Sequence, residues 1–103
     1  MKVVIARRAA KDISDNYDWI SDWSTQAANR WRDRLLKAID SLETTYERFP
    51  FAPENDEYEG NLREFMTGKK PHIFRIVFEI RGDTVFILRV RHARQDRLNA
   101  EDF

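Results

Sequence analysis

Three strand-like runs near the end of the chain constrain its fold more than any other feature. The runs extend from Leu62 to Thr67, from His72 to Ile80 and from Thr84 to His92, and each gap between them contains a glycine. Hydrophobic runs joined by short glycine-containing turns pair with their neighbours as antiparallel strands. The second half of the chain is therefore predicted to form an antiparallel meander.

Two amphipathic helices are predicted before the meander. Apolar residues recur three or four positions apart from Arg8 to Trp23, and a second stripe of the same period extends to Tyr46. Between the stripes lie Ser24 and Thr25, which are favourable N-cap residues. The segment FPFAP then ends the second helix, because proline lacks an amide donor. The two helices are expected to form a hairpin.

The order of these elements indicates a single α+β domain over residues 1–103. A short β-branched run from Lys2 to Ala6 precedes the helices, so the order is β-α-α-β-β-β. We expect the helix hairpin to pack on one face of a mainly antiparallel four-stranded sheet, because each element then buries its apolar side. Residues 54–61 are acidic and are predicted to form a linking loop. A chain of 103 residues is long enough for one such core but not for two.

Composition excludes several classes of protein. The chain has no cysteine and two histidines, so disulfides and thiolate metal sites are excluded, and we expect no metal and no cofactor. The apolar run at the start is followed at once by Arg7 and Arg8, which is unlike a signal peptide or a membrane span. We therefore expect a cytoplasmic protein with no membrane partner.

Residue parity assigns the arginines of the meander to a face of the sheet, because successive side chains of a strand point to opposite sides. We expect the alternate residues that include Phe74 to face the helices, which leaves Arg75 on the other, open face. In the last strand we expect the alternate residues that begin with Phe86 to face the helices. Arg89 and Arg91 then lie on the open face beside Arg75.

Arg63, in the first strand of the meander, joins this face if Leu62 and Met66 point to the core. Such a cluster of like charges is costly unless an anion meets it, and the planar guanidinium fork suits phosphate and carboxylate groups. The arginines therefore predict a phosphate-like or acidic partner. The alternative is that they pair internally while their stems pack on the sheet. The candidate internal partners are Glu64, Glu79, Asp83 and Asp96.

Several features together resemble a known family. They are the aromatic helix hairpin, the FPFAP break, and the stretches Leu62 to Phe65, His72 to Phe78 and Ile87 to Asp96. In this order and spacing they resemble the ParE/RelE superfamily of toxins from type II toxin–antitoxin systems. The resemblance covers nearly the whole chain. It implies a small bacterial toxin that is neutralised by a cognate antitoxin in a hetero-oligomeric complex.

Two toxic activities occur in this superfamily. The ParE-like branch poisons DNA gyrase, and the RelE-like branch cuts mRNA in the ribosome. The ending RVRHARQD is similar to the ParE-like pattern, with Arg91 in place of an apolar residue and Gln95 in place of an arginine. We therefore expect a gyrase-binding toxin, with a ribosome-dependent and metal-independent mRNA endoribonuclease as the alternative.

For the nuclease alternative, the chemistry of RNA cleavage assigns the catalytic residues. Arg75, Arg89 and Arg91 would stabilise negative charge at phosphorus, and His92 would act as the acid. The candidate bases are Glu64, Lys69 and Lys70. No tyrosine follows the last strand, which disfavours this alternative because many ribosome-dependent members of the superfamily have an aromatic residue there. The other interpretation of His92 is a hydrogen bond from its ring to a backbone carbonyl or to Asp96.

Two further groups of residues are predicted to bind partners. Target binding, to gyrase or to the ribosome and its mRNA, is assigned to basic residues of the meander and of the segment after it: Arg63, Lys69, Lys70, Arg94 and Arg97. The antitoxin interface is assigned to Trp19, Trp23 and Trp31, because so small a domain cannot easily bury all three and exposed tryptophan marks protein interfaces. The alternatives are solvated lysines in a turn and tryptophans that pack in the core or the hairpin.

Overall fold

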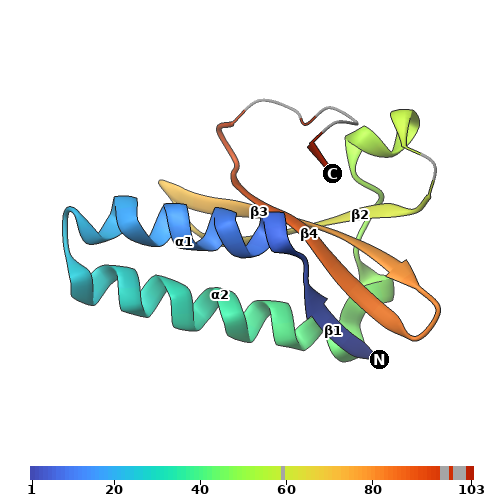
Figure 1. The fold of residues 1–103 in the computed structure, drawn as a ribbon, viewed down its shortest axis with the longest axis horizontal. Coiled ribbons are helices and arrows are strands. Elements are labelled where there is room, and N and C mark those ends of the chain that lie inside the picture. Colours follow the sequence, from blue (N-terminus) through green and yellow to red (C-terminus); the bar gives the residue numbers. More distant parts are fainter. Residues whose placement is uncertain (59, 96–97, 99–101) are drawn as a thin grey trace.

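The computed structural model describes residues 1–58, 60–95, 98 and 102–103, and it confirms the predicted α+β fold (Figure 1). The elements follow the predicted order, with two short 3-10 helices, η1 and η2, before the meander. The bounds are β1 Lys2–Ile5, α1 Arg7–Ser21, α2 Thr25–Thr45, η1 Tyr46–Arg48, η2 Pro53–Glu57, β2 Leu62–Lys69, β3 His72–Arg81 and β4 Thr84–His92.

The helix hairpin turns where the sequence predicts. The side-chain oxygen of Ser24 accepts a hydrogen bond from the amide of Ala27 at 3.1 Å, so Ser24 caps α2. The first helix ends at Ser21 and the second at Thr45, close to the predicted ends.

The strands form one sheet in the order β1-β4-β3-β2. The strands β2, β3 and β4 make the predicted antiparallel meander. In contrast, β1 pairs in parallel with the first half of β4, from Lys2 opposite Thr84 to Ile5 opposite Ile87. The helix hairpin thus connects β1 to the meander, and β2 lies at the far edge of the sheet.

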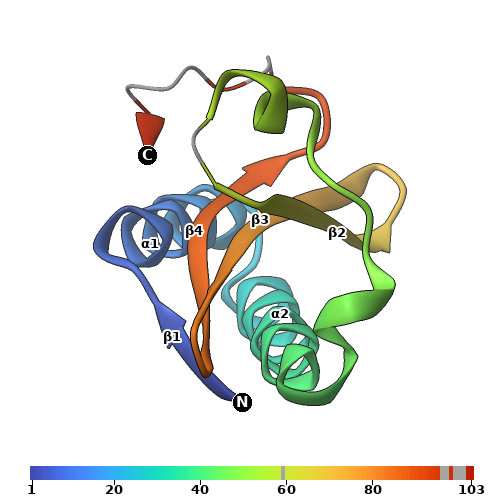
Figure 2. The same cartoon turned by 90° about the vertical axis from the view of Figure 1, so that its right-hand side faces the viewer.

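Both helices bury their apolar stripes against one face of the sheet (Figure 2). The helices contribute Ile13, Trp31, Leu35 and Ile39, and the strands contribute Phe74, Ile76, Phe78, Val85, Ile87 and Val90. Burial of this apolar surface is the main stabilising term of the fold. Among the described residues, no helix has both the length and the hydropathy needed to cross a membrane.

The other face of the sheet was expected to be open, and that expectation is wrong. Leu62 and Val77 are buried on this face against Ala52 and Leu98. The predicted acidic loop forms η2 above it, and the end of the chain lies beside η2 (Figure 2). The physical reason is that Val77 and Leu88 make this face apolar too, so it needs a cover.

A β-bulge in β4 corrects the predicted orientation of the last strand. The register between β3 and β4 shifts between Val77 and Phe78, and Leu88 is the extra residue. Before the bulge, the helices are faced by Ile87 and not by Phe86 as predicted. The alternation of apolar residues did not predict the bulge, because apolar residues lie on both faces of β4 near it.

After the bulge the predicted parity holds. Val90 is buried in the main core, Arg89 lies opposite Val77, and Arg91 lies opposite Arg75. Residues directly opposite each other on paired strands share a face. Arg75, Arg89 and Arg91 therefore lie on the same face of the sheet, as predicted.

Arg63 does not join this face. It lies opposite Phe78 and so points to the helix side, whereas Leu62 and Met66 lie on the other side. One terminal nitrogen of Arg63 donates to the backbone carbonyl of Phe49 at 2.6 Å. The expectation failed because Leu62 is buried in the second apolar cluster and not in the main core.

Candidate functional site

Arg75 is held in a buried ion pair on the covered face of the sheet. Its two terminal nitrogens donate to the two carboxylate oxygens of Glu54 at 3.1 and 2.6 Å. A second carboxylate, that of Glu64, lies 3.6 Å away. The side chains of Arg75 and Glu54 are 13% and 2% exposed. In this bidentate ion pair, Glu54 occupies the two terminal N–H donors with which Arg75 would bind a phosphate.

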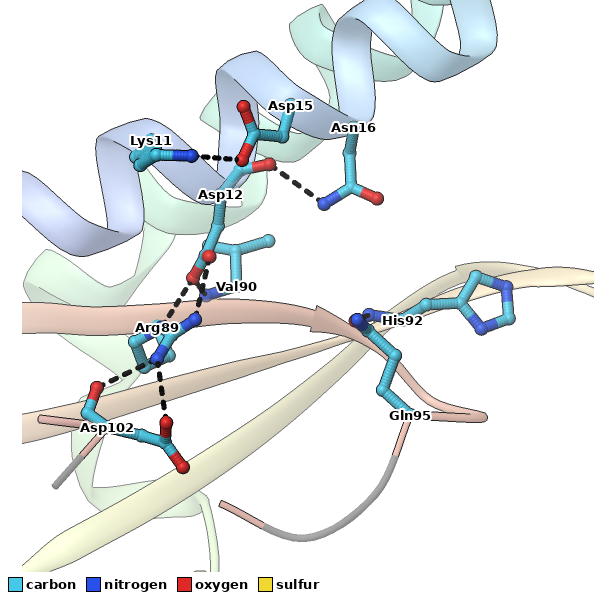
Figure 3. A network of polar contacts seen from close by, with 9 residues as sticks. All are labelled: Lys11, Asp12, Asp15, Asn16, Arg89, Val90, His92, Gln95 and Asp102. Carbon is cyan, nitrogen blue, oxygen red and sulfur yellow. Dashed lines mark hydrogen bonds and ion pairs between the residues drawn. The ribbon is translucent and has the colours of Figure 1, made fainter. Parts of the chain in front are cut away.

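Arg89 is held in a similar way by α1 and by the end of the chain (Figure 3). Its Nε and one terminal nitrogen donate to the carboxylate of Asp12 at 2.7 and 2.9 Å, and its other terminal nitrogen donates to the backbone carbonyl of Asp102 at 2.8 Å. The same carboxylate accepts the amide of Val90 at 2.9 Å, just beyond the residues of β4 that pair with β1. Asp12 therefore neutralises Arg89 and also replaces a strand partner at the edge of β4.

The two ion pairs change the interpretation of the arginine cluster. Hydrogen bonds from Glu54 and Asp12 raise the pKa values of Arg75 and Arg89, although burial opposes the rise. Both guanidinium groups stay charged, and both are matched by carboxylates of their own chain. Internal pairing is thus what the structure shows for Arg75 and Arg89. Arg91 is half-buried and lies opposite Arg75.

The carboxyl group of Glu54 is expected to make the free energy of unfolding depend on pH in the acidic range. Burial alone would raise the pKa of Glu54, but hydrogen bonds from Arg75 and from the amide of Leu98, with the charge of Arg75, lower it from 4.5 to about 2. A carboxyl group whose pKa is lowered by folding stabilises the folded state at any pH above its pKa in the unfolded chain. That contribution is lost as the pH falls from 4.5 toward 2. We expect this loss to be roughly 2–3 kcal/mol of unfolding free energy.

Urea unfolding at a series of pH values measures this dependence. The Glu54→Gln variant is the matched control, because it keeps the shape of the side chain and removes the titrating group. The variant should be less stable near neutral pH and should lose less stability below pH 4.5. Equal acid dependence of the two proteins would show that Glu54 does not carry the effect.

His92 lies at the end of β4 with both ring nitrogens engaged. Its Nε2 lies 2.8 Å from the backbone carbonyl of Pro71, and its Nδ1 accepts the amide of Arg94 at 3.1 Å. These contacts fit the neutral ring that carries its proton on Nε2. The predicted hydrogen bond to a backbone carbonyl is therefore present, and it ties the exit of β4 to the β2–β3 turn.

An apolar cavity of about 700 Å³ lies between the tip of the helix hairpin and the β2–β3 turn. Trp19 and Trp23 stand at its opening, 50% and 80% exposed, with their rings in edge contact. Trp31 is buried at its base and packs on Phe74, with ring centroids 5.1 Å apart. The cavity is lined by Trp19, Ile20, Trp23, Ala27, Trp31, Arg34, Leu35, Thr67, Gly68, Lys69, Lys70, Pro71, His72 and Phe74. We call it the tryptophan cavity.

The rim of the tryptophan cavity is basic. Arg34, Lys69 and Lys70 line it, and no carboxylate is among the residues that do. All three side chains belong to exposed residues. An apolar cavity with exposed aromatic walls and a cationic rim suits the apolar side chain of an acidic protein segment.

Two more predicted residues lie close by. A smaller cavity of about 320 Å³ is lined by Asn16, Trp19, His92, Arg94 and Gln95, so it shares Trp19 with the tryptophan cavity. Arg94 is exposed there. Arg97 lies outside the described residues.

The structure thus regroups the predicted residues. The tryptophans assigned to the antitoxin and the lysines assigned to the target line one cavity, and the arginines assigned to catalysis lie on the opposite, covered face. Sequence reasoning missed Arg34 on the rim and the two carboxylates, Glu54 and Asp12. Glu54 and Asp12 carry no local signal, because they meet their arginines from 21 and 77 positions away.

Comparisons with known proteins agree with this fold. A family model described as "ParE toxin of type II toxin-antitoxin system, parDE" matches residues 3–97. A solved structure described as "Chromosomal ParDE TA system from P. aeruginosa" superimposes with a TM-score of 0.69 at 20% identity, over 89% of this chain and 95% of that chain. At that identity the likeness shows the shared fold. No curated protein matches the chain.

Proposed function

The chain belongs to the ParE toxin family of type II toxin–antitoxin systems, and from this premise we propose that it arrests bacterial growth by binding DNA gyrase. A cognate antitoxin neutralises it by forming a hetero-oligomeric complex, and both events take place in the cytoplasm. The observation that supports the proposal is the tryptophan cavity, whose exposed tryptophans and basic rim suit a protein partner.

The antitoxin is proposed to bind at the opening of the tryptophan cavity. Trp19 and Trp23 are large, rigid and exposed, which is the usual character of residues that dominate a protein interface. Trp31 contributes as the buried base of the cavity and not as a contact of its own.

Target binding is proposed for the basic residues around the same opening, which are Lys69, Lys70 and Arg94. Their exposed charges suit an acidic surface of the target. Arg63 is less suited, because its guanidinium bonds to Phe49 and stacks on Phe51 at 4.7 Å.

The ribonuclease alternative is less well supported. In a ribonuclease, the guanidinium groups of Arg75 and Arg89 would have to stabilise charge at phosphorus. Here they form ion pairs with the carboxylates of Glu54 and Asp12. His92, the proposed acid, has both ring nitrogens bonded to backbone groups. The alternative therefore needs a rearrangement of several buried contacts before catalysis.

Expression of the chain without its antitoxin is expected to stop growth, and the purified protein is expected to inhibit supercoiling by purified gyrase. The Lys69→Glu, Lys70→Glu double variant should weaken this inhibition by about tenfold or more, because it reverses two exposed charges on the rim without touching the core. Supercoiling assays over a range of protein concentrations measure both effects.

The controls separate the two candidate targets. Lys37→Glu on α2 is an exposed charge reversal away from the cavity lining, and it should leave inhibition unchanged. Growth arrest with unaffected supercoiling would remove gyrase as the target. Cleavage of mRNA in a translation extract would then support the ribonuclease alternative.

A further inference from the structure

The tryptophan cavity has the volume and the depth of a small-molecule site. Its volume of about 700 Å³ lies within the range of roughly 300–1,000 Å³ that is usual for ligand pockets. Trp31, Leu35 and Phe74 are buried at its base, whereas Trp19 and Trp23 are exposed at its opening. A ligand can therefore enter at the opening and remove its apolar surface from water against the base.

Aromatic side chains line both the opening and the base of the cavity. The ring of Trp19 is in edge contact with the rings of Trp23 and His72, with centroids 6.3 and 6.2 Å away. At the base, Trp31 packs on Phe74. Aromatic rings prefer edge-to-face or offset contacts with further rings, and such contacts add to the effect of the buried area. The walls thus favour a ligand with a flat aromatic body over one with an alkyl chain.

The charges at the rim are available to a ligand. Arg34 on α2, and Lys69 and Lys70 at the β2–β3 turn, line the cavity and are exposed. Within the described part of the chain, no ion pair joins any of the three to a carboxylate. In this they differ from Arg75 and Arg89, which are paired internally. An anionic group at the opening would meet cations that the described carboxylates leave unmatched.

The backbone of the β2–β3 turn brings two of these charges to the rim. Thr67 lies opposite a core residue of β3, so its side chain and that of Lys69, two positions later, point to the helix side of the sheet. Gly68 between them has a φ of +107°, and a side chain there would collide with the carbonyl oxygen of His72. Glycine at this position therefore allows the tight turn that sets Lys69 and Lys70 beside the cavity.

From this arrangement we infer that the tryptophan cavity binds a small aromatic anion, and that this ligand competes with the antitoxin. The aromatic body lies against the tryptophans, and the anionic group lies at the rim formed by Arg34, Lys69 and Lys70. The binding depends on the cavity alone. The competition rests on the proposed function, because it requires the antitoxin at the same opening. Such a ligand shifts the toxin–antitoxin complex toward free toxin by mass action.

Two fluorescent probes test the binding on the isolated chain. Anilinonaphthalene sulfonate carries an aromatic body with an anionic group, and phenylnaphthylamine carries the same body without the charge. The anionic probe should bind in the micromolar range. The indole N–H resonances of all three tryptophans should shift in NMR spectra, because every tryptophan of the chain lines the cavity. No binding below millimolar concentration, or binding that leaves these resonances unchanged, would overturn the inference.

Replacement of two rim lysines by glutamine separates the charge from the apolar contacts. The Lys69→Gln, Lys70→Gln variant should bind the anionic probe roughly three- to tenfold more weakly than the unchanged chain does. It should bind the neutral probe with unchanged affinity, because that probe has no group for the rim. If the variant binds the anionic probe as tightly as the unchanged chain, the rim does not hold the anion and the ligand class is wrong.

A cavity-filling replacement tests the location of the ligand. Ala27 is half-buried in the lining, so the ring introduced by Ala27→Phe should occupy the cavity and weaken the binding of both probes by about tenfold or more. The matched control is Ala10→Phe, at an exposed position of α1 outside the lining, which should bind both probes as the unchanged chain does. Unaltered binding to a folded Ala27→Phe variant would place the ligand elsewhere.

Competition is measured by titrating the antitoxin into the chain with and without an excess of the anionic probe. With the probe at about ten times its dissociation constant, the apparent affinity of the antitoxin should fall roughly tenfold. A bound probe that leaves this affinity unchanged would refute the competition and also the proposed antitoxin position, while the ligand site would stand. Gyrase inhibition is assayed separately, so failure of the proposed target changes neither result.

Discussion

Replacement of both Trp19 and Trp23 by alanine is expected to weaken the complex with the antitoxin by at least about a hundredfold. Each tryptophan is half or more exposed, so its removal takes area from the interface and little from the core. Truncation of a central tryptophan commonly costs about 2 kcal/mol of binding free energy or more. Isothermal titration of the purified partners measures the affinity, and co-expression in cells measures whether the antitoxin still restores growth.

The matched control for this prediction is Val4→Ala. Val4 is 41% exposed on β1 and is not a lining residue of the tryptophan cavity, so it tests the general effect of removing exposed apolar area. The control should bind the antitoxin as the unchanged chain does. If the double tryptophan variant is folded, as judged by its unfolding transition, and binds with unchanged affinity, the antitoxin site lies elsewhere.

Replacement of Arg75 by methionine is expected to destabilise the fold by about 3–5 kcal/mol. The change leaves the carboxylate of Glu54, which is 2% exposed, without its guanidinium partner. A domain of this size has roughly 5–15 kcal/mol of total stability, so much of it would be lost. Urea unfolding followed by circular dichroism measures the change.

The double variant Arg75→Met, Glu54→Leu separates the charge from the packing. It removes both charges and keeps apolar volume on the covered face, so it should recover most of the lost stability. Recovery of stability together with full toxicity would assign Arg75 to the fold. A double variant that is stable but has lost its toxicity would instead support a direct role for Arg75 in the function.

Much of the fold could be predicted because its signals are local. The apolar period marked both helices, Ser24 marked the start of the second, and glycine turns marked the meander. The alternation around Phe74 placed Arg75 on the correct face. Each of these signals depends only on residues within a few positions of one another.

The candidate site was predicted less completely. Exposed tryptophan near the hairpin turn and lysines in the β2–β3 turn were named, but their meeting in one cavity depends on how the hairpin lies on the sheet. The bulge at Leu88 was not predicted. Both faces of the sheet are covered, so apolar residues of β4 can be buried on either face and their alternation does not reveal the bulge.

By itself, therefore, the sequence determined the elements, their order and the family of this protein. The periods of helices and strands are fixed by backbone geometry, so the spacing of apolar residues in each short segment reveals them. Only the tertiary structure decided what the arginines do. Arg75 and Arg89 carry the same charge as Lys69 and Lys70, yet the first pair lies against Glu54 and Asp12 while the second lies on the open rim of a cavity. Whether a charge is neutralised or offered to a partner depends on which distant residues folding brings within a few ångströms of it.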